Sequence, residues 1–312
     1  MFVNHKDTRL SSPWITAGTY HPSKFEISTS NSGKFLSIFI VCFALTGCVT
    51  APAAPRPSSP AQHAATDDRL DAILWQTTSA EYHVLVESIY ATARWHLERA
   101  LADRQWTALP AQKANFQQLP PALIMDVDET VIDTGQFQSS LVKNAARFSS
   151  KPWRDWQLSN EPRAVPGVLE FIASAQARGV TVFFVTNRDH ATESATRRSL
   201  TSLGIQLPDH IDTVLTRRER PDWSSDKESR RRFVAQSYRV IMLIGDDLSD
   251  FISEYRANAQ ARAAEAAKYS HWGSKWFMLP NPMYGSWEAA LYEFNAKLNA
   301  AEISRRKFQQ LR

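Results

Sequence analysis

The stretch that decides the fold is Pro-Ala-Leu-Ile-Met-Asp-Val-Asp-Glu-Thr, residues 121–130. Its first half is a short apolar run, which predicts a buried strand. Its second half places Asp126 and Asp128 directly after that strand. Open α/β sheets bind ligands at the carboxyl ends of their strands, so both carboxylates stand where a site is expected. An isolated Asp-x-Asp is more often an acidic surface turn, and the rest of the chain decides between these two interpretations.

Outward from this stretch, strands alternate with helices. The region from Leu70 to Trp106 contains no Pro or Gly and has apolar residues at helical spacing, which predicts one or two amphipathic helices packed on the main body. The alternation predicts an α/β fold in which helices cover both faces of a parallel sheet. The further strands are expected at residues 180–185, 239–244 and 275–279. The helices that alternate with them are expected at residues 165–178, 190–203, 227–236, 248–268 and 287–298.

Polar residues follow the ends of three of these strands. The first strand is followed by Asp126 and Asp128, the second by Thr-Asn-Arg at residues 186–188, and the third by Gly-Asp-Asp-Leu-Ser-Asp at residues 245–250. Lys227 lies at the start of the helix before the third strand. Because the carboxyl ends of neighbouring parallel strands meet at one edge of a sheet, we expect these side chains in one crevice.

These residue types suit phosphoryl transfer. A carboxylate such as Asp126 can attack phosphorus and form an aspartyl-phosphate, which divides one difficult displacement into two easier ones. A second carboxyl group, that of Asp128, can protonate the departing alcohol. Lys227 can neutralise phosphoryl oxygens, and Mg²⁺ prefers oxygen ligands such as those of Asp126 and Asp246. Because Asp126 must be ionised while Asp128 is protonated, we expect an acidic pH optimum.

The order of these motifs resembles that of the haloacid dehalogenase superfamily. Within it, the chain from about residue 70 to 298 resembles the class C, or lipoprotein-type, bacterial acid phosphatases. The resemblance implies a Rossmann-like haloacid dehalogenase fold, with a smaller, mainly helical subdomain formed by the N-terminal helices and the segment inserted after the first motif. We expect this phosphatase domain at residues 67–300 and a C-terminal tail at residues 301–312. The stretches that carry the resemblance are residues 74–82, 126–133, 164–167, 185–188 and 278–288.

The resemblance also implies a role for each motif residue. Asp126 would be the nucleophile and a metal ligand, and Asp128 would be the general acid/base that offers its backbone carbonyl to the metal. Asp246 would complete the Mg²⁺ site, and Asp250 would support that site from behind. Asp247 stands where the family commonly has Asn, so its role stays open. The residues that would hold the phosphate are Thr186, Asn187 and Lys227.

Members of this family are similar in dephosphorylating small monoesters, often nucleoside 5′-monophosphates. A nucleobase needs a flat aromatic slot, and Trp153 and Tyr284 match the places that shape the family's substrate pocket. Ordinary packing is the alternative for each of them, and Trp156 is expected to be structural. Sugar phosphates or other small monoesters are the alternative substrates. The alternative from another class is a non-catalytic, ligand-binding surface lipoprotein such as a haem binder, but the eight His residues form no spaced ligand cluster.

The N-terminal region predicts export and lipidation. Residues 35–45 form an apolar run that is too short to span a bilayer and suits the hydrophobic region of an export signal. Leu-Thr-Gly-Cys at residues 45–48 resembles the lipobox of bacterial lipoproteins, and a short buried helix with an incidental Cys is the alternative. We expect a signal segment at residues 1–47, a lipidated Cys48 and a disordered Pro/Ala-rich tether that extends to residue 66. By analogy, the anchor would lie in the outer membrane of a bacterial envelope, with the protein facing the periplasm.

The charge balance is mildly basic, with a formal net charge of +4 and a pI near 9.1. This bias is no signature of nucleic-acid binding, so we expect no nucleic-acid polymer as a partner. The expected partners are a small phosphomonoester and a lipid membrane, and a homodimer stays open. Two basic clusters are expected as solvated faces that could also steer anionic substrates. They are Arg217, Arg218 and Arg220, and Arg230, Arg231 and Arg232.

Overall fold

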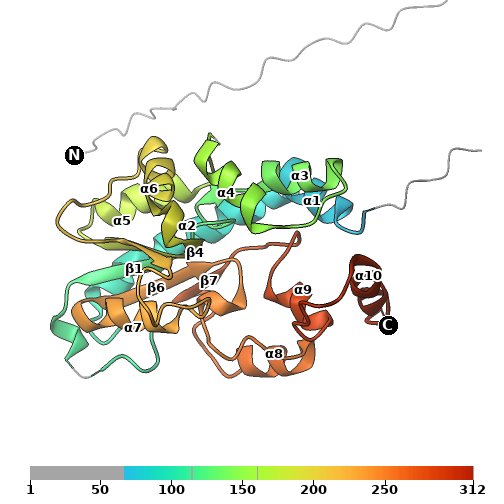
Figure 1. Ribbon diagram of the computed structural model, residues 1–312. Helices are drawn as coiled ribbons and strands as arrows, with labels where there is room; N and C mark the ends of the chain where they lie inside the picture. The colour runs from blue at the N-terminus through green and yellow to red at the C-terminus, as the bar shows by residue number, and fades with distance from the viewer. Residues whose placement is uncertain (1–66, 114, 160, 312) are drawn as a thin grey trace, which may run out of the picture. The chain divides into compact units, whose positions relative to one another are not determined.

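A parallel β-sheet forms the centre of the described part of the chain (Figure 1). The computed structural model describes residues 67–113, 115–159 and 161–311. The strand order is β5-β4-β1-β6-β7, and every neighbouring pair is parallel. The predicted α/β fold is therefore confirmed, with the strand before Asp126 at its centre. In sheet order, the strands are Val214–Arg217, Thr181–Asp189, Pro121–Met125, Arg239–Gly245 and Trp276–Met278.

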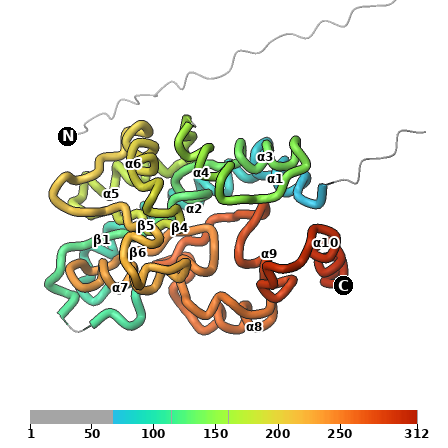
Figure 2. The backbone as a smooth tube through the Cα atoms, in the orientation of Figure 1, coloured from blue at the N-terminus to red at the C-terminus, as the bar shows by residue number. Residues whose placement is uncertain are grey.

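The sheet is buried on both faces because alternate residues of a strand point to opposite sides. In β1, Leu123 and Met125 belong to one buried cluster, and Ala122 and Ile124 belong to the other. Helices α2, α5 and α6 cover the first face, and α7 covers the second (Figure 1). After β4 the chain forms α6 and returns as β5 at the edge of the sheet (Figure 2). The bounds of these helices are Ala80–Ala102 (α2), Val168–Gln176 (α5), Glu193–Ser202 (α6) and Glu228–Ser237 (α7).

Two N-terminal helices precede the sheet, as predicted for this region. Helix α1 spans Leu70–Thr78, and α2 begins after Ser79, whose hydroxyl oxygen accepts a hydrogen bond from the Tyr82 N–H (3.1 Å). Ser suits this position because its side-chain oxygen satisfies a backbone N–H that has no partner within the helix. The buried Arg239 of β6 ties the other end of α2 to the sheet. It donates to the backbone carbonyls of Ala100 (2.8 Å), Asp103 (2.9 Å) and Trp106 (3.1 Å).

The segment between β1 and α5 forms the smaller helical part. Helix α3 packs against α1, and Gly135 permits this approach because a Cβ atom there would lie 2.6 Å from Thr77 Cγ2. The expected helical subdomain is present, but α2 lies outside it and packs with α5 over the sheet. The elements of the segment are β2 (Ile132–Asp133), α3 (Gly135–Lys143), α4 (Ser150–Ser159) and β3 (Arg163–Ala164), and the two short strands pair antiparallel.

The single helix expected at residues 248–268 is wrong. A 3-10 turn, η3 (Leu248–Asp250), is followed by a separate helix, α8 (Ala259–Ala266). The side chains of Asp247 and Asp250 cap this turn reciprocally, which favours a short isolated turn at the end of β6. Apolar periodicity did not reveal this break, because the capping contacts are made by polar side chains, which leave no mark in an apolar pattern.

Three smaller differences concern the edge of the sheet and the end of the chain. Strand β5 was not expected, because four residues carry little periodic signal. Helix α9 spans only Ser286–Leu291, since Glu293 and Phe294 adopt positive φ values. The expected C-terminal tail contains most of α10 (Ala300–Phe308), whose Lys307 forms salt bridges with Asp68 (3.0 Å) and Glu288 (2.5 Å).

Within residues 67–113, 115–159 and 161–311, no helix is long and apolar enough to cross a membrane. The expected signal segment, Cys48 and the tether lie outside the described residues. The export and lipidation of the chain therefore stay predictions.

Candidate active site

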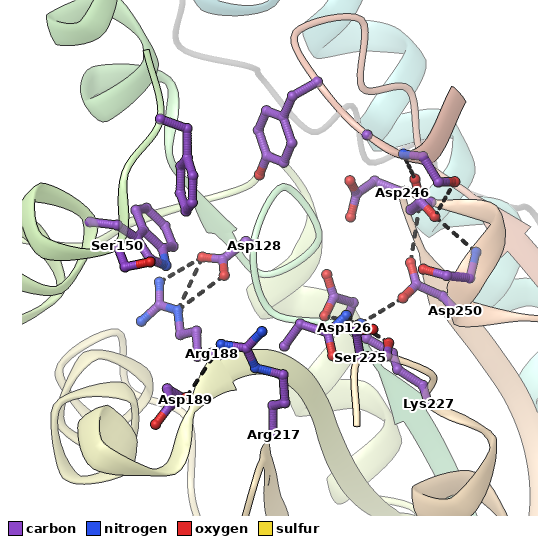
Figure 3. A pocket seen from close by; sticks show the side chains of 18 of the residues that line it. Asp126, Asp128, Ser150, Arg188, Asp189, Arg217, Ser225, Lys227, Asp246 and Asp250 are labelled. Atoms are coloured by element: carbon purple, nitrogen blue, oxygen red, sulfur yellow. Dashed lines mark hydrogen bonds and ion pairs between the residues drawn. The ribbon is translucent and has the colours of Figure 1, made fainter. Parts of the chain in front are cut away.

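A pocket of about 640 Å³ opens at the carboxyl ends of the strands (Figure 3). Parallel strands end at one edge of a sheet, which explains why motifs far apart in the sequence meet there. Of the residues predicted for the site within the described part of the chain, only Thr186 is absent from the pocket lining. Those that line it are Asp126, Asp128, Trp153, Asn187, Lys227, Asp246, Asp250 and Tyr284.

Asp126 and Asp128 lie in the turn that follows β1. The N–H of Asp126 donates to the carbonyl of Ile244 in β6 (3.0 Å), so sheet pairing extends to the first carboxylate. A tight turn follows, in which the N–H of Val131 donates to the carbonyl of Val127 (2.8 Å). This local geometry directs both carboxylates into the pocket (Figure 3).

Lys227 joins two of the predicted carboxylates. It stands at the start of α7, and only 4% of its side chain is exposed. Its ammonium group donates to Asp126 Oδ1 and to Asp250 Oδ1 (2.6 Å). A Cβ atom at position 245 would overlap the Asp250 side chain, so Gly245 is required for this close approach. Lys227, which was predicted to hold the phosphate, therefore lies beside the predicted nucleophile.

Asp246 completes a cluster of three carboxylates. Oxygen atoms of Asp126, Asp246 and Asp250 all lie within 4.8 Å of one another. Asp246 accepts hydrogen bonds from the Thr130 hydroxyl (3.0 Å) and from Asn281 Nδ2 (2.9 Å). Burial raises the pKa of Asp126 to about 7, although Lys227 opposes this shift. Burial also raises the pKa of Asp246 well above its usual value, and the charges of Asp126 and Asp250 add to this effect.

The donor set of this cluster fits a hard divalent cation. It offers only carboxylate oxygens, and oxygen is the donor that Mg²⁺ prefers. A cation there would also relieve the repulsion among carboxylates that one ammonium group does not neutralise. Asp250 lies in the cluster itself and not behind it, although Lys227 occupies one of its oxygens. The metal contact expected from the Asp128 backbone stays a prediction.

Asp128 forms a second charged pair on the other side of the pocket (Figure 3). Arg188 donates to its two oxygens, from Nη2 at 2.7 Å and from Nε at 3.1 Å. The Arg188 side chain is fully buried, and its guanidinium lies 5.6 Å from the ring centre of Trp153. Such a forked pair fixes the direction of a carboxylate. Arg188 belongs to the motif at residues 186–188, but the sequence did not predict its contact with Asp128.

Thr186 and Asn187 shape the end of β4. The Thr186 hydroxyl oxygen is buried and accepts a hydrogen bond from the N–H of Arg188 (3.1 Å). Asn187 donates to the carbonyl of Ser225 (3.0 Å) and accepts from Arg230 Nη2 (2.8 Å). The contacts of both residues within the chain are thus structural, and their predicted contact with phosphate stays a prediction.

The solvated face expected at residues 230–232 is wrong for two of its three arginines. Arg230 and Arg231 are buried, and burial lowers the pKa of Arg230 to about 10. Arg230 donates to the carbonyl of Thr186, and Arg231 donates to the carbonyls of Ser249 (3.0 Å) and Asp250 (2.9 Å). The guanidinium groups therefore satisfy carbonyls at the ends of β4 and η3, a role that a run of charges does not reveal.

Aromatic side chains form one wall of the pocket. Trp153 of α4 stacks on Trp156, with ring centres 5.1 Å apart and planes inclined by 12°. Trp153 lines the pocket and Trp156 does not, so the structure separates the two as predicted. Tyr284 also lines the pocket, and its hydroxyl donates to Glu129 Oε1 (3.3 Å).

Glu129 is a residue of the first motif whose importance the sequence did not reveal. It is fully buried, has a φ of 59°, and accepts hydrogen bonds from Gln76 of α1 and from Thr134 before α3. Burial raises its pKa to about 8, and the bonds from Thr134 oppose this shift. With the Tyr284 contact, one carboxyl group joins three separate segments around the turn that carries Asp126 and Asp128.

Asp247 faces away from the carboxylate cluster. It accepts hydrogen bonds from the N–H (2.6 Å) and hydroxyl (2.7 Å) of Ser286 and from the N–H of Ser249 (2.9 Å). Although burial alone would raise it, these bonds hold the pKa of Asp247 below its usual value. Its role is therefore to hold the start of α9 against the end of β6.

A parallel sheet whose central strands end in a carboxylate–lysine cluster is the architecture of a phosphoryl-transfer enzyme. The sequence model of the HAD superfamily, subfamily IIIB (acid phosphatase), matches residues 54–287, and the chain belongs to this family. This membership places it among the phosphoric monoester hydrolases and agrees with the resemblance noted from its motifs.

Solved structures support the same assignment. The class C acid phosphatase from Bacillus anthracis is 31% identical, covers 79% of this chain and 98% of its own, and superposes with a TM-score of 0.68. A structure of that enzyme with tungstate bound is 30% identical, covers 80% and 98%, and has the same TM-score of 0.68.

More distant curated relatives are plant proteins. The stem 31 kDa glycoprotein of Glycine max is 22% identical over 162 residues, and the stem 28 kDa glycoprotein of the same plant is 21% identical over 165 residues. The match spans 52% of this chain and 58% of each of these relatives.

Proposed function

We propose that this protein is a Mg²⁺-dependent acid phosphatase that hydrolyses small phosphomonoesters through an aspartyl-phosphate on Asp126. The observation that carries the proposal is the position of Lys227, which lies between Asp126 and Asp250 beside the third carboxylate, Asp246. A nucleophile, a cationic phosphate ligand and a cluster of oxygen donors at one strand edge are the parts that phosphoryl transfer needs.

The proposed reaction has two displacements. In the first, an Asp126 carboxylate oxygen bonds to phosphorus, the ester P–O bond breaks, and the alcohol leaves with a proton from Asp128. In the second, water bonds to phosphorus, gives a proton to Asp128, and releases phosphate from Asp126. Lys227 holds the phosphoryl oxygens, and Arg188 keeps Asp128 directed at the oxygen of the alcohol. Mg²⁺, held by Asp126, Asp246 and the Asp128 backbone, would supply charge neutralisation.

We further propose a preference for nucleoside 5′-monophosphates and an acidic pH optimum. The support for the first is the aromatic wall, where Trp153 and Tyr284 border a pocket wide enough for a base and a sugar. The tungstate bound in the Bacillus anthracis relative supports oxyanion binding by this fold, since tungstate is tetrahedral like phosphate. Sugar phosphates are the competing substrates. An acidic optimum would follow from the need for an ionised Asp126 and a protonated Asp128. Burial raises the pKa of Asp126, and a divalent cation held beside it would lower that pKa again.

For the N-terminal region we propose lipidation at Cys48 and an outer-membrane anchor that faces the periplasm. The support is the lipobox-like sequence at residues 45–48 together with the membership of the phosphatase family. Labelling of the protein with a radioactive fatty acid in a bacterial host, beside a Cys48→Ser variant, tests this proposal. Equal labelling of both proteins would contradict it.

The enzymatic proposal is tested by phosphate release from the full protein. The substrates are adenosine 5′-monophosphate, glucose 6-phosphate and an aryl phosphate, each with Mg²⁺ and with a chelator. We expect release that the chelator abolishes, with the nucleotide preferred, and a fall of roughly 10⁴-fold or more for Asp126→Asn. Asp155→Asn is the matched control, because Asp155 is exposed and pairs only with Lys151 among the described residues. An Asp126→Asn protein that keeps its turnover would refute the mechanism, and preference for the sugar ester would refute the nucleotide assignment.

A further inference from the structure

The pocket wall at the ends of β4 and β5 carries more arginines than carboxylates (Figure 3). Arg217 Nη2 and Arg218 Nη1 contact the same oxygen of Asp189, at 3.3 and 3.1 Å. The other Asp189 oxygen accepts a hydrogen bond from the N–H of Ala191 (3.2 Å), at the start of the next 3-10 turn. One carboxylate therefore serves two guanidinium groups, and one positive charge is left over.

The backbone is bent to place both arginines on this wall. Successive residues of a strand point to opposite faces, so Arg217 and Arg218 would normally diverge. Arg218 instead has a φ of 67°, in the left-handed region that costs a non-glycine residue free energy. A hydrogen bond from its N–H to the carbonyl of Trp223 (2.8 Å) maintains this conformation. Both side chains consequently line the pocket and reach Asp189.

Arg217 has spare donor capacity inside the pocket. Its side chain is 33% exposed, and the only hydrogen bond that its guanidinium donates within the described residues is the one from Nη2 to Asp189. Figure 3 shows its guanidinium group extending from the end of β5 into the pocket beside Arg188. The Nη1 group of Arg217 is therefore free to donate to an anion in the pocket.

Arg154 adds a further positive charge to the same pocket from α4. It forms no salt bridge with any other residue in the part of the chain that the structure describes. Arg188, by contrast, is already committed to Asp128. The pocket thus holds its unsatisfied positive charge at a distance from the carboxylate cluster around Lys227.

We propose that Arg217 and Arg218 form a second anion subsite, which raises kcat/KM for those phosphomonoesters whose alcohol carries another phosphate or a carboxylate. The inference rests on the proposed function for the position of the scissile phosphate, which would lie at Asp126 and Lys227. The second anionic group would then face Arg217, with Arg218 nearer the mouth of the pocket. Guanidinium groups suit this task because their donors match the oxygens of phosphate and carboxylate.

The test compares matched substrates on the full protein. Fructose 1,6-bisphosphate is compared with fructose 6-phosphate for a second phosphate, and 3-phosphoglycerate with glycerol 3-phosphate for a carboxylate. We expect kcat/KM to favour at least one doubly anionic substrate by about tenfold, well beyond the statistical gain from two scissile groups. Arg217→Gln should remove most of this preference, and Arg218→Gln should remove less because its side chain is more exposed.

Arg220→Gln is the matched control. Arg220 lies in the same basic cluster but packs on Phe233 (4.1 Å) and Trp223 (4.8 Å), and it does not line the pocket. Its substitution should leave the preference unchanged. A wild-type enzyme with equal kcat/KM for both members of each pair would overturn the subsite, and so would a preference that Arg217→Gln retains.

A binding measurement separates this inference from the proposed function. Calorimetry of fructose 1,6-bisphosphate and fructose 6-phosphate with the Asp126→Asn variant needs no turnover. Tighter binding of the bisphosphate that Arg217→Gln abolishes supports the subsite, even if the aryl phosphate assay shows no phosphatase activity. Equal binding of the two sugars overturns it, even if that assay is positive.

Discussion

The two sides of the pocket carry opposite imbalances of charge. Around Lys227, three carboxylates lie together and two of them contact one ammonium group, whereas around Asp189 two guanidinium groups share one carboxylate. Arg188 and Asp128 form a balanced pair in the same pocket (Figure 3). An excess of carboxylates suits a divalent cation, and an excess of guanidinium groups suits an anion. The comparison indicates that net charge is unevenly distributed in this pocket, as the proposed cation and anion sites require.

Substitution of Lys227 should have the largest effect on stability and turnover, because it increases the excess of negative charge in the carboxylate cluster. Lys227→Met leaves buried carboxylates without their cation and should lower the free energy of unfolding by about 3 kcal/mol or more. Turnover should fall by roughly 10³-fold, since the phosphate loses its cationic ligand. Urea unfolding with and without Mg²⁺ checks this, and we expect Mg²⁺ to restore part of the lost stability.

Lys151→Met is the control for that experiment, because the Lys151 side chain is exposed and pairs with Asp155 within one helix. Its stability should change by less than about 1 kcal/mol. Equal stabilities for the Lys227 variant and the wild type would contradict the view that the carboxylate cluster depends on this ammonium group.

Substitution of Arg188 should have an intermediate effect, because it breaks the balanced pair. Arg188→Gln frees the Asp128 side chain, and a misdirected proton donor should lower kcat by roughly 10²-fold with little change in KM. Arg188→Lys keeps the charge and should recover part of this loss. The measurement is kcat across the pH range with an aryl phosphate, in which a positioning role predicts an altered pH profile. A change confined to stability would show that the pair is only structural.

Substitution of Asp189 should have the smallest effect on stability. It removes the carboxylate that two guanidinium groups share, and so increases the excess of positive charge on that side of the pocket. Burial alone would raise the pKa of Asp189, but the Ala191 N–H and the two arginines hold it below the usual value of 3.8. The carboxylate therefore contributes stability above about pH 4, and this contribution is lost as the pH falls through the lowered pKa. Asp189→Asn should cost less than about 1 kcal/mol at neutral pH and nothing at the acidic limit. Thermal unfolding at several pH values measures the difference, and a difference independent of pH would exclude the ion pairs as its source.

Much of this site was predictable from the sequence. The apolar run before Asp126 predicted the central strand, and the order of the motifs predicted that Asp126, Lys227 and Asp246 would meet at its end. Those inferences succeeded because strand burial and the parallel arrangement follow from local pattern and chain order. Asp250 is closer to the cluster than the sequence indicated, because its position depends on contact with Gly245.

Other features had no local signal. Three arginines of the two basic clusters have different surroundings. Arg217 lines the pocket, Arg220 packs on aromatic rings, and Arg230 is buried against β4. Glu129 likewise looks like a surface acid in the motif, but it is fully buried among partners from three segments. Several of the partners lie far away in the sequence, as Gln76 and Tyr284 do from Glu129, so residue type and spacing do not distinguish the roles.

The sequence by itself determined the α/β class, the family and the carboxylates of the candidate centre, because strand patterns and motif order are written along the chain. Only the tertiary structure decided which charges face one another. The pairing of β4 with β5 brings Arg217 and Arg218 to Asp189, and the helix after β5 brings Lys227 to Asp126. Electrostatic interactions depend on distance and burial in three dimensions. The separation of excess negative and excess positive charge within the pocket is therefore a property of the fold.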